Sequence, residues 1–193
     1  MIHLSLVLVL LMAGGAAAGP LDQPGYATSF ACSACHGFAG NSKADTVPIL
    51  AGMTRAYLTK ALQDYASGKR LSTEMEPYAK MTLHTGIGDV AAYFAAQRRE
   101  PWPGRVDPAA AERGKDAAAP CAVCHGADGR GDPAKGIPDL RGQPAAYLEN
   151  QMRLFKADRR SPGDEALRSI KALMRTVPDE SLADLAAFFA SQR

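Results

Sequence analysis

The sequence predicts an all-α protein. Alanine, the strongest helix former, occurs 36 times among 193 residues, whereas the β-branched residues isoleucine and valine together occur 12 times. Apolar residues also recur at helical spacing, as at Tyr57, Leu58, Ala61, Leu62 and Tyr65, which fall on one face of a helix. A sheet-based fold needs more β-branched residues than this chain contains, so we expect helices packed on helices.

The first eighteen residues have the anatomy of a secretory signal peptide. An apolar run over residues 4–12 is followed by small residues that place Ala16 and Ala18 as an A-x-A cleavage signal. The alternative is an uncleaved membrane anchor, but a spanning helix needs about 20 apolar residues and this run is shorter. We therefore expect residues 1–18 to be removed and the mature chain to be exported to the periplasm.

The rest of the chain is an internal duplication. Three landmarks repeat in the same order, at residues 32–37 and 121–126, 48–52 and 138–142, and 91–98 and 186–193. A repeat of this length predicts two similar units, an N-terminal domain over residues 19–100 and a C-terminal domain over residues 101–193. Residues 99–104, with two prolines, form the expected short linker between them.

Each predicted unit carries a motif that attaches a cofactor. Domains of this size, rich in alanine and poor in large aliphatic residues, need a disulfide, a metal or a buried prosthetic group to supplement the core. The pattern Cys-x-x-Cys-His, typical of c-type haem attachment, occurs twice, at Cys32, Cys35 and His36 and at Cys121, Cys124 and His125. On one helical turn these residues share a face, so both thiols can bond to the porphyrin while the histidine binds iron. We predict two covalently bound haem c groups.

Three other uses of the cysteines are less consistent with the pattern. A structural zinc site needs two such pairs close together in sequence, whereas these pairs lie in separate repeats. A thioredoxin-like redox pair needs a βαβ context, which the composition does not support. Simple disulfides suit an exported protein, but they do not explain a histidine in both copies.

The chain resembles dihaem cytochromes of the cytochrome c4 type, a group that includes the cytochrome subunit of sulfide-oxidising flavocytochrome c. The resemblance covers the whole mature length and rests on tandem Cys-x-x-Cys-His motifs, each followed by Pro-x-Leu-x-Gly, a Tyr-Leu helix and a terminal Ala-Ala-aromatic-Phe helix. It implies two class I cytochrome c domains facing each other across a pseudo-twofold interface. It also implies that the carbonyls of Pro48 and Pro138 accept the Nδ1 protons of His36 and His125. A methionine sulfur would then be the sixth ligand of each iron.

The first half offers two methionines for the sixth ligand. Met75 precedes Tyr93 by 18 residues, which is the spacing that the resemblance favours. Met81 is the alternative ligand or a core residue, and His84 is a weaker third candidate. We predict that His36 and Met75 bind the first iron.

The second half departs from the family pattern at this ligand. The corresponding segment, residues 165–170, contains no methionine, and Met174 follows later in the chain. Either the segment is rearranged so that His125 and Met174 bind the second iron, or that iron has an open or weakly held sixth site. We predict the first arrangement.

Two pairs of basic residues end corresponding helices. Lys69 and Arg70 in the first half match Arg159 and Arg160 in the second. They could pair with haem propionates, or they could be solvated cations at helix ends that suit the helix dipole. The residues alone do not decide between these two roles.

These features predict an electron carrier and not an enzyme. The formal net charge of +2 gives no sign of a nucleic-acid-binding surface, and no Ser-His-acid set or phosphate-binding loop occurs. Six-coordinate haem iron suits single-electron transfer, so we expect partners among periplasmic or membrane redox proteins, with no more than peripheral contact with the membrane. The alternative is a haem enzyme or the cytochrome subunit of a periplasmic dehydrogenase, for example one that oxidises sulfur compounds.

Overall fold

A computed structural model of the chain describes residues 19–161 and 163–193. The predicted signal peptide, residues 1–18, lies outside the described residues. The described part is helical and contains no β-strand, only two isolated bridges. The prediction of an all-α protein is therefore confirmed. No helix in the described part is long and apolar enough to span a membrane.

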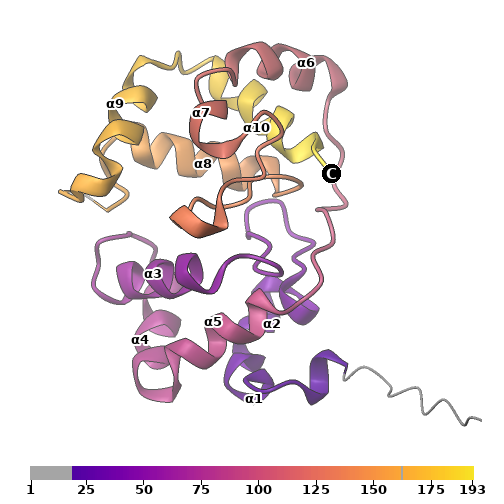
Figure 1. The fold of residues 1–193 in the computed structure, drawn as a ribbon, viewed down its shortest axis with the longest axis vertical. Helices are drawn as coiled ribbons and strands as arrows, with labels where there is room; N and C mark the ends of the chain where they lie inside the picture. The colour runs from indigo at the N-terminus through magenta and orange to yellow at the C-terminus, as the bar shows by residue number, and fades with distance from the viewer. Residues whose placement is uncertain (1–18, 162) are drawn as a thin grey trace, which may run out of the picture.

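The helices form two groups stacked one above the other, joined by a segment that runs along one side of the molecule (Figure 1). The first group comprises α1 (Tyr26–Ser29), α2 (Ser33–His36), α3 (Arg55–Ala66), α4 (Met75–Thr85) and α5 (Ile87–Ala95). The second comprises α6 (Pro108–Ala117), α7 (Ala122–His125), α8 (Ala145–Lys156), α9 (Arg168–Thr176) and α10 (Ser181–Ser191). Short 3-10 turns occur at Pro20–Asp22, Phe30–Cys32, Phe38–Gly40, Pro133–Lys135 and Glu165–Leu167.

Each group has its own apolar core, centred on its last helix. In the first group, Val90, Tyr93 and Phe94 of α5 are buried and pack with Leu58 of α3. In the second group the core consists of Ala118, Leu148, Leu185, Ala186, Phe188 and Phe189. Tyr93 and Phe94 correspond to Phe188 and Phe189, at the same place in the repeated segments 91–98 and 186–193. Both pairs are buried in a core, which explains why the terminal Ala-Ala-aromatic-Phe motif recurs.

Two glycines allow the last helix of each group to approach its first helix closely. A Cβ atom at Gly25 would lie 2.7 Å from the carbonyl oxygen of Asp89, and one at Gly114 would lie 2.0 Å from that of Asp184. Both distances are shorter than any real Cβ contact, so backbone packs directly on backbone at these crossings. The two glycines occupy equivalent places in the duplication, and so do the two aspartates.

The connecting segment is fixed to both groups and is not a free linker. The side chain of Trp102 is buried and packs against Ile49 and Ala51 of the first group. Its backbone N–H donates to the carbonyl of Gly142 in the second group, at 2.8 Å. The expected short linker therefore contributes to the contact between the two groups.

Candidate functional site

The first Cys-x-x-Cys-His motif forms a single tight turn. Cys32 immediately precedes α2, and Cys35 and His36 are its last two residues. Gly37 follows in a positive-φ conformation and ends the helix. Neither cysteine of this motif is in a disulfide; Cys32 is half-buried and Cys35 is exposed. Burial raises the pKa of the Cys32 thiol, which does not favour a reactive redox thiolate at this position.

The imidazole of His36 is held by one hydrogen bond. Its side chain is 5% exposed, and Nδ1 lies 2.8 Å from the carbonyl oxygen of Pro48. A carbonyl can only accept, so Nδ1 carries the proton and Nε2 keeps a free lone pair. Burial lowers the pKa of His36, although the Pro48 hydrogen bond opposes this effect. The ring is therefore neutral and has a nitrogen suited to bind a metal.

The second motif repeats this geometry. Cys121 precedes α7, and Cys124 and His125 end it. His125 Nδ1 lies 3.1 Å from the carbonyl oxygen of Pro138, and burial lowers the pKa of His125. Neither motif gathers the ligands of a zinc site, because no three His, Cys, Asp or Glu side chains converge anywhere in residues 19–161 and 163–193. Two thiols and one neutral imidazole on a turn are instead the groups that hold haem c.

The methionines predicted as sixth ligands lie in different settings. Met75 is the first residue of α4 and is half-buried, whereas Met81 is 36% exposed on the same helix. His84 is exposed near the end of α4. This arrangement leaves Met75 as the partly covered candidate in the first half.

In the second half, Met174 is 5% exposed within α9. Counted back from the terminal aromatic residue, Ile170 occupies the sequence place of Met75, and Met174 occupies that of the buried Ala79. The second half therefore does not present a methionine at the place where the first half has Met75. The ligand roles of both methionines stay predictions.

Two arginines lie where the groups meet, Arg70 buried and Arg160 half-buried. Arg70 is 4% exposed and donates to the Tyr147 hydroxyl at 3.0 Å and to Gln151 Oε1 at 2.6 Å. Arg160 donates to the Tyr57 hydroxyl at 3.1 Å and to the same oxygen of Gln151 at 3.0 Å. All of these partners are neutral, and Arg70 Nε is buried with no partner among the described residues.

This cluster has excess positive charge. Burial opposes ionisation of Tyr57, but Arg160 and Arg70 outweigh it and lower the pKa of Tyr57 to about 7. A buried cation is stable when an anion pairs with it, so the cluster fits the carboxylates of haem propionates. Arg70 is thus not a solvated helix end, whereas Lys69 and Arg159 are exposed and do fit that role.

Tyr57 and Tyr147 were not predicted as site residues, because their helical apolar spacing is that of ordinary core residues. Their recurrence at equivalent positions in the two halves was the available signal.

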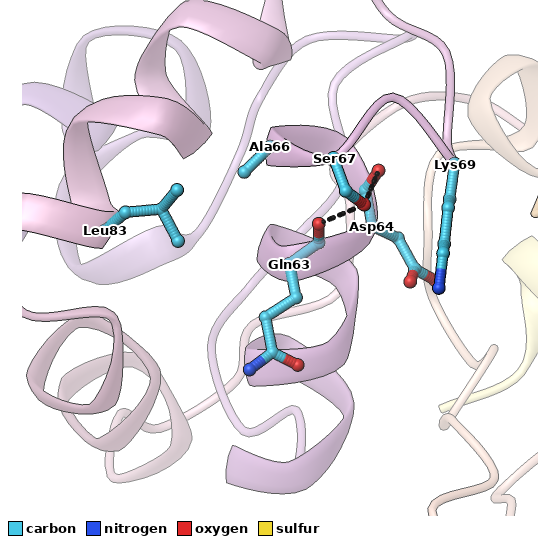
Figure 2. A pocket seen from close by; sticks show the side chains of 6 residues that line it. All are labelled: Gln63, Asp64, Ala66, Ser67, Lys69 and Leu83. Carbon is cyan, nitrogen blue, oxygen red and sulfur yellow. Dashed lines mark hydrogen bonds between the residues drawn. The ribbon is translucent and has the colours of Figure 1, made fainter.

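The cavity drawn in Figure 2 is separate from these sites. It has a volume of about 340 Å³ and is lined by Gln63, Asp64, Ala66, Ser67, Lys69 and Leu83. Five of these residues come from the end of α3 and the turn after it, and Leu83 comes from α4. None of the cysteines, histidines or methionines predicted to hold haem contributes to its wall.

Comparison with known proteins agrees with this geometry. The Cytochrome c family profile matches residues 111–193. The chain is 31% identical to cytochrome c4 of Pseudomonas aeruginosa over 95% of this chain and 94% of that protein. It is 32% identical to the thiosulfate dehydrogenase electron acceptor of Thiomonas intermedia, over 83% of this chain and 78% of that protein.

A solved structure shows the same fold. The crystal structure of reduced recombinant cytochrome c4 from Pseudomonas stutzeri superposes with a TM-score of 0.78 at 29% identity, covering 88% of this chain and 97% of that one. The predicted pair of class I cytochrome c folds is therefore confirmed. The chain belongs to the cytochrome c4 family, and it is a dihaem electron-transfer cytochrome that binds two haem c groups covalently.

Proposed function

We propose that this cytochrome is an exported carrier that relays single electrons between redox proteins of the periplasm or the membrane. The observation that carries the proposal is the duplicated contact of His36 with Pro48 and of His125 with Pro138. In both halves a neutral, oriented imidazole stands beside two thiols, which is the arrangement of an electron-transfer haem and not of a substrate pocket. Bound haem c supplies the one-electron chemistry.

The residues of the chain have the following proposed roles. Thioether bonds form at Cys32, Cys35, Cys121 and Cys124, and His36 and His125 bind the two irons through Nε2. Met75 and Met174 provide the sixth ligands. A sulfur ligand stabilises reduced iron and excludes other ligands, so each site exchanges electrons with little rearrangement. These roles place the two haem sites in separate domains, residues 19–100 and 101–193.

Arg70 and Arg160 are proposed to pair with haem propionates. Arg70 is buried and Arg160 half-buried at the boundary of the two domains, and neither has an acidic hydrogen-bond partner in the described part of the chain. A carboxylate bound there would gain charge-assisted hydrogen bonds. Because each arginine reaches across to the other domain, the same contacts would hold the two haem sites in a fixed relation.

A second candidate function is favoured by one comparison. The electron acceptor of a thiosulfate dehydrogenase in Thiomonas intermedia matches most of this chain. We propose as the alternative that the donor is a dehydrogenase that oxidises sulfur compounds, with this chain as its acceptor or cytochrome subunit. Whether the sixth coordination position of the second iron is occupied distinguishes an electron-accepting role from that of a haem enzyme. An iron that activates substrate needs this position to be open.

The experiment is to purify the protein from the periplasmic fraction of an expressing cell. Mass spectrometry of the denatured chain should show two haem masses and an N-terminus near Gly19. Variants in which both cysteines of one motif are changed to alanine should each retain one haem. The reduced protein should pass electrons to an oxidised cytochrome c without turning over thiosulfate alone. A chain with fewer than two haems, or thiosulfate oxidation by the isolated protein, would contradict the proposal.

A further inference from the structure

The side chain of Gln143 binds the backbone of a residue in the other half of the molecule. The backbone N–H of Ile49 donates to Gln143 Oε1 at 2.9 Å, and Gln143 Nε2 donates to the carbonyl of Ile49 at 2.8 Å. The two residues are 94 positions apart in the chain. Gln143 is 2% exposed and Ile49 is 1% exposed, so water does not compete for either hydrogen bond.

This contact lies directly behind the histidine of the first haem site. The N–H of Ile49 and the carbonyl of Pro48 belong to the same peptide group, and that carbonyl accepts the Nδ1 proton of His36 at 2.8 Å. A continuous chain of hydrogen bonds therefore runs from His36 through the 48–49 peptide to Gln143. In such a chain each bond polarises the next, so an acceptor on the N–H makes the carbonyl a stronger acceptor.

The second half does not repeat the arrangement. The residue equivalent to Gln143 in the first half is Met53, which carries no amide. Asp139, equivalent to Ile49, is contacted instead by Arg99, whose Nη1 donates to the Asp139 carbonyl at 3.3 Å. The hydrogen bond from His125 to Pro138 is 3.1 Å long, compared with 2.8 Å at His36. The stronger contact thus occurs where the amide completes the chain of hydrogen bonds.

We propose that Gln143 is a positioning residue for the first iron. Through the 48–49 peptide it strengthens the hydrogen bond of His36, so that a residue of the second half sets the reduction potential of the first haem. The proposal rests on the proposed role of His36 as an iron ligand. A histidine whose Nδ1 proton is held more firmly is a stronger donor to the metal, and a stronger donor favours oxidised iron.

The test uses the full-length protein with both haems. Gln143→Met puts into this position the residue that the first half has at the equivalent place, with similar size and no amide. The potential of the first haem should rise, the potential of the second should stay unchanged, and the paramagnetically shifted NMR signals of the His36 ring should move. The single-haem variants, in which both cysteines of one motif are changed to alanine, assign the signals to the first and second haem.

Two further variants separate positioning from general stabilisation. Gln143→Glu keeps an oxygen acceptor for the Ile49 N–H and loses the Nε2 donor to the Ile49 carbonyl. Because the acceptor is the group that polarises the 48–49 peptide, the first potential should stay at the wild-type value or fall. Gln97→Met removes another buried amide of the first half, which donates to the Tyr93 carbonyl and to Gln23, and it should leave both potentials unchanged.

Equal shifts in the Gln143→Met and Gln97→Met variants, a shift of the second haem only, or no shift at all would overturn the proposal. Failure of the proposed function is distinguishable, because the wild-type protein would then lack two histidine-ligated haems before any substitution.

Discussion

Arg70 and Arg160 pair with each other across the boundary between the two halves, through an antiparallel backbone bridge. Each guanidinium then reaches a tyrosine of the opposite half, Tyr147 for Arg70 and Tyr57 for Arg160. Each also lies over an aromatic ring of its own half, 4.5 Å from the centroid of Tyr65 for Arg70 and 4.3 Å from that of Phe155 for Arg160. The interface is therefore built from equivalent residues that exchange partners, as expected when duplicated domains meet face to face.

Replacing the buried arginine should change both stability and redox properties. Arg70→Leu removes two hydrogen bonds to neutral partners and a cation beside the proposed propionates. We expect a loss of about 1–3 kcal/mol in the free energy of unfolding and a lower potential for one haem, because a nearby cation disfavours oxidised iron. Denaturant unfolding and potentiometric titration measure the two effects. Lys69→Leu, at the exposed neighbouring position, is the control and should change neither quantity appreciably.

The sixth ligand of the first iron can be assigned with two variants. Met75→Ala should abolish one sulfur-to-iron charge-transfer band and lower one potential, because loss of the thioether destabilises reduced iron. The spectrum of the second haem should be unaffected. Met81→Ala changes an exposed residue of the same helix and should alter little. If Met81→Ala abolishes the band while Met75→Ala preserves it, the ligand is Met81.

The two haems should be unequal. The second half has Ile170 at the sequence place of Met75, and Met174 lies one helical turn later. A ligand delivered from this later position should be held less firmly, so we expect the C-terminal haem to have the lower potential. It should also bind added cyanide, carbon monoxide or imidazole more readily. Titration of the intact protein should resolve two one-electron steps, and Met174→Ala should affect only the lower one. Two indistinguishable haems that both refuse added ligands would refute this prediction.

The close crossing of α6 and α10 makes Gly114 irreplaceable by a larger residue. A Cβ atom there would lie 2.0 Å from the Asp184 carbonyl oxygen, so Gly114→Ala must push the two helices apart. Overpacking of this kind costs about 1–3 kcal/mol in the free energy of unfolding, measurable by denaturant titration of the holoprotein. Gly136→Ala is a suitable comparison, because no atom lies within 4 Å of a Cβ atom at that position. Its positive φ makes that change mildly unfavourable, and a larger loss than for Gly114→Ala would contradict the steric explanation.

The parts of the site that depend on short sequence separations could be predicted from the sequence. The Cys-x-x-Cys-His turns need only one turn of helix, and the duplication makes each copy support the other. The contacts of His36 with Pro48 and of His125 with Pro138 span 12 and 13 residues, and the family resemblance supplied them.

Contacts between the halves could not be predicted in the same way. The burial of Arg70 and the amide of Gln143 depend on how two folded units pack, and no periodicity in one helix specifies the residues of another unit that face it. Gln143 even breaks the repeat, since its counterpart is Met53. Recurrence of the arginines and tyrosines at equivalent positions was the available signal for one set of contacts between the halves, whereas the Gln143 contact occurs where the copies differ.

The position of Trp102 shows that the repeat boundary in the sequence is not a structural seam. Its indole lies beyond the end of the first repeat and yet packs against Ile49 and Ala51 of that repeat, in a small cluster that Val106 and Ala145 of the second half also contact. A gene cut at residue 100 would yield a first unit that lacks both this ring and the Gln143 amide. The first half is thus completed by residues that follow it in the chain, so the two halves should not behave as independent folding units.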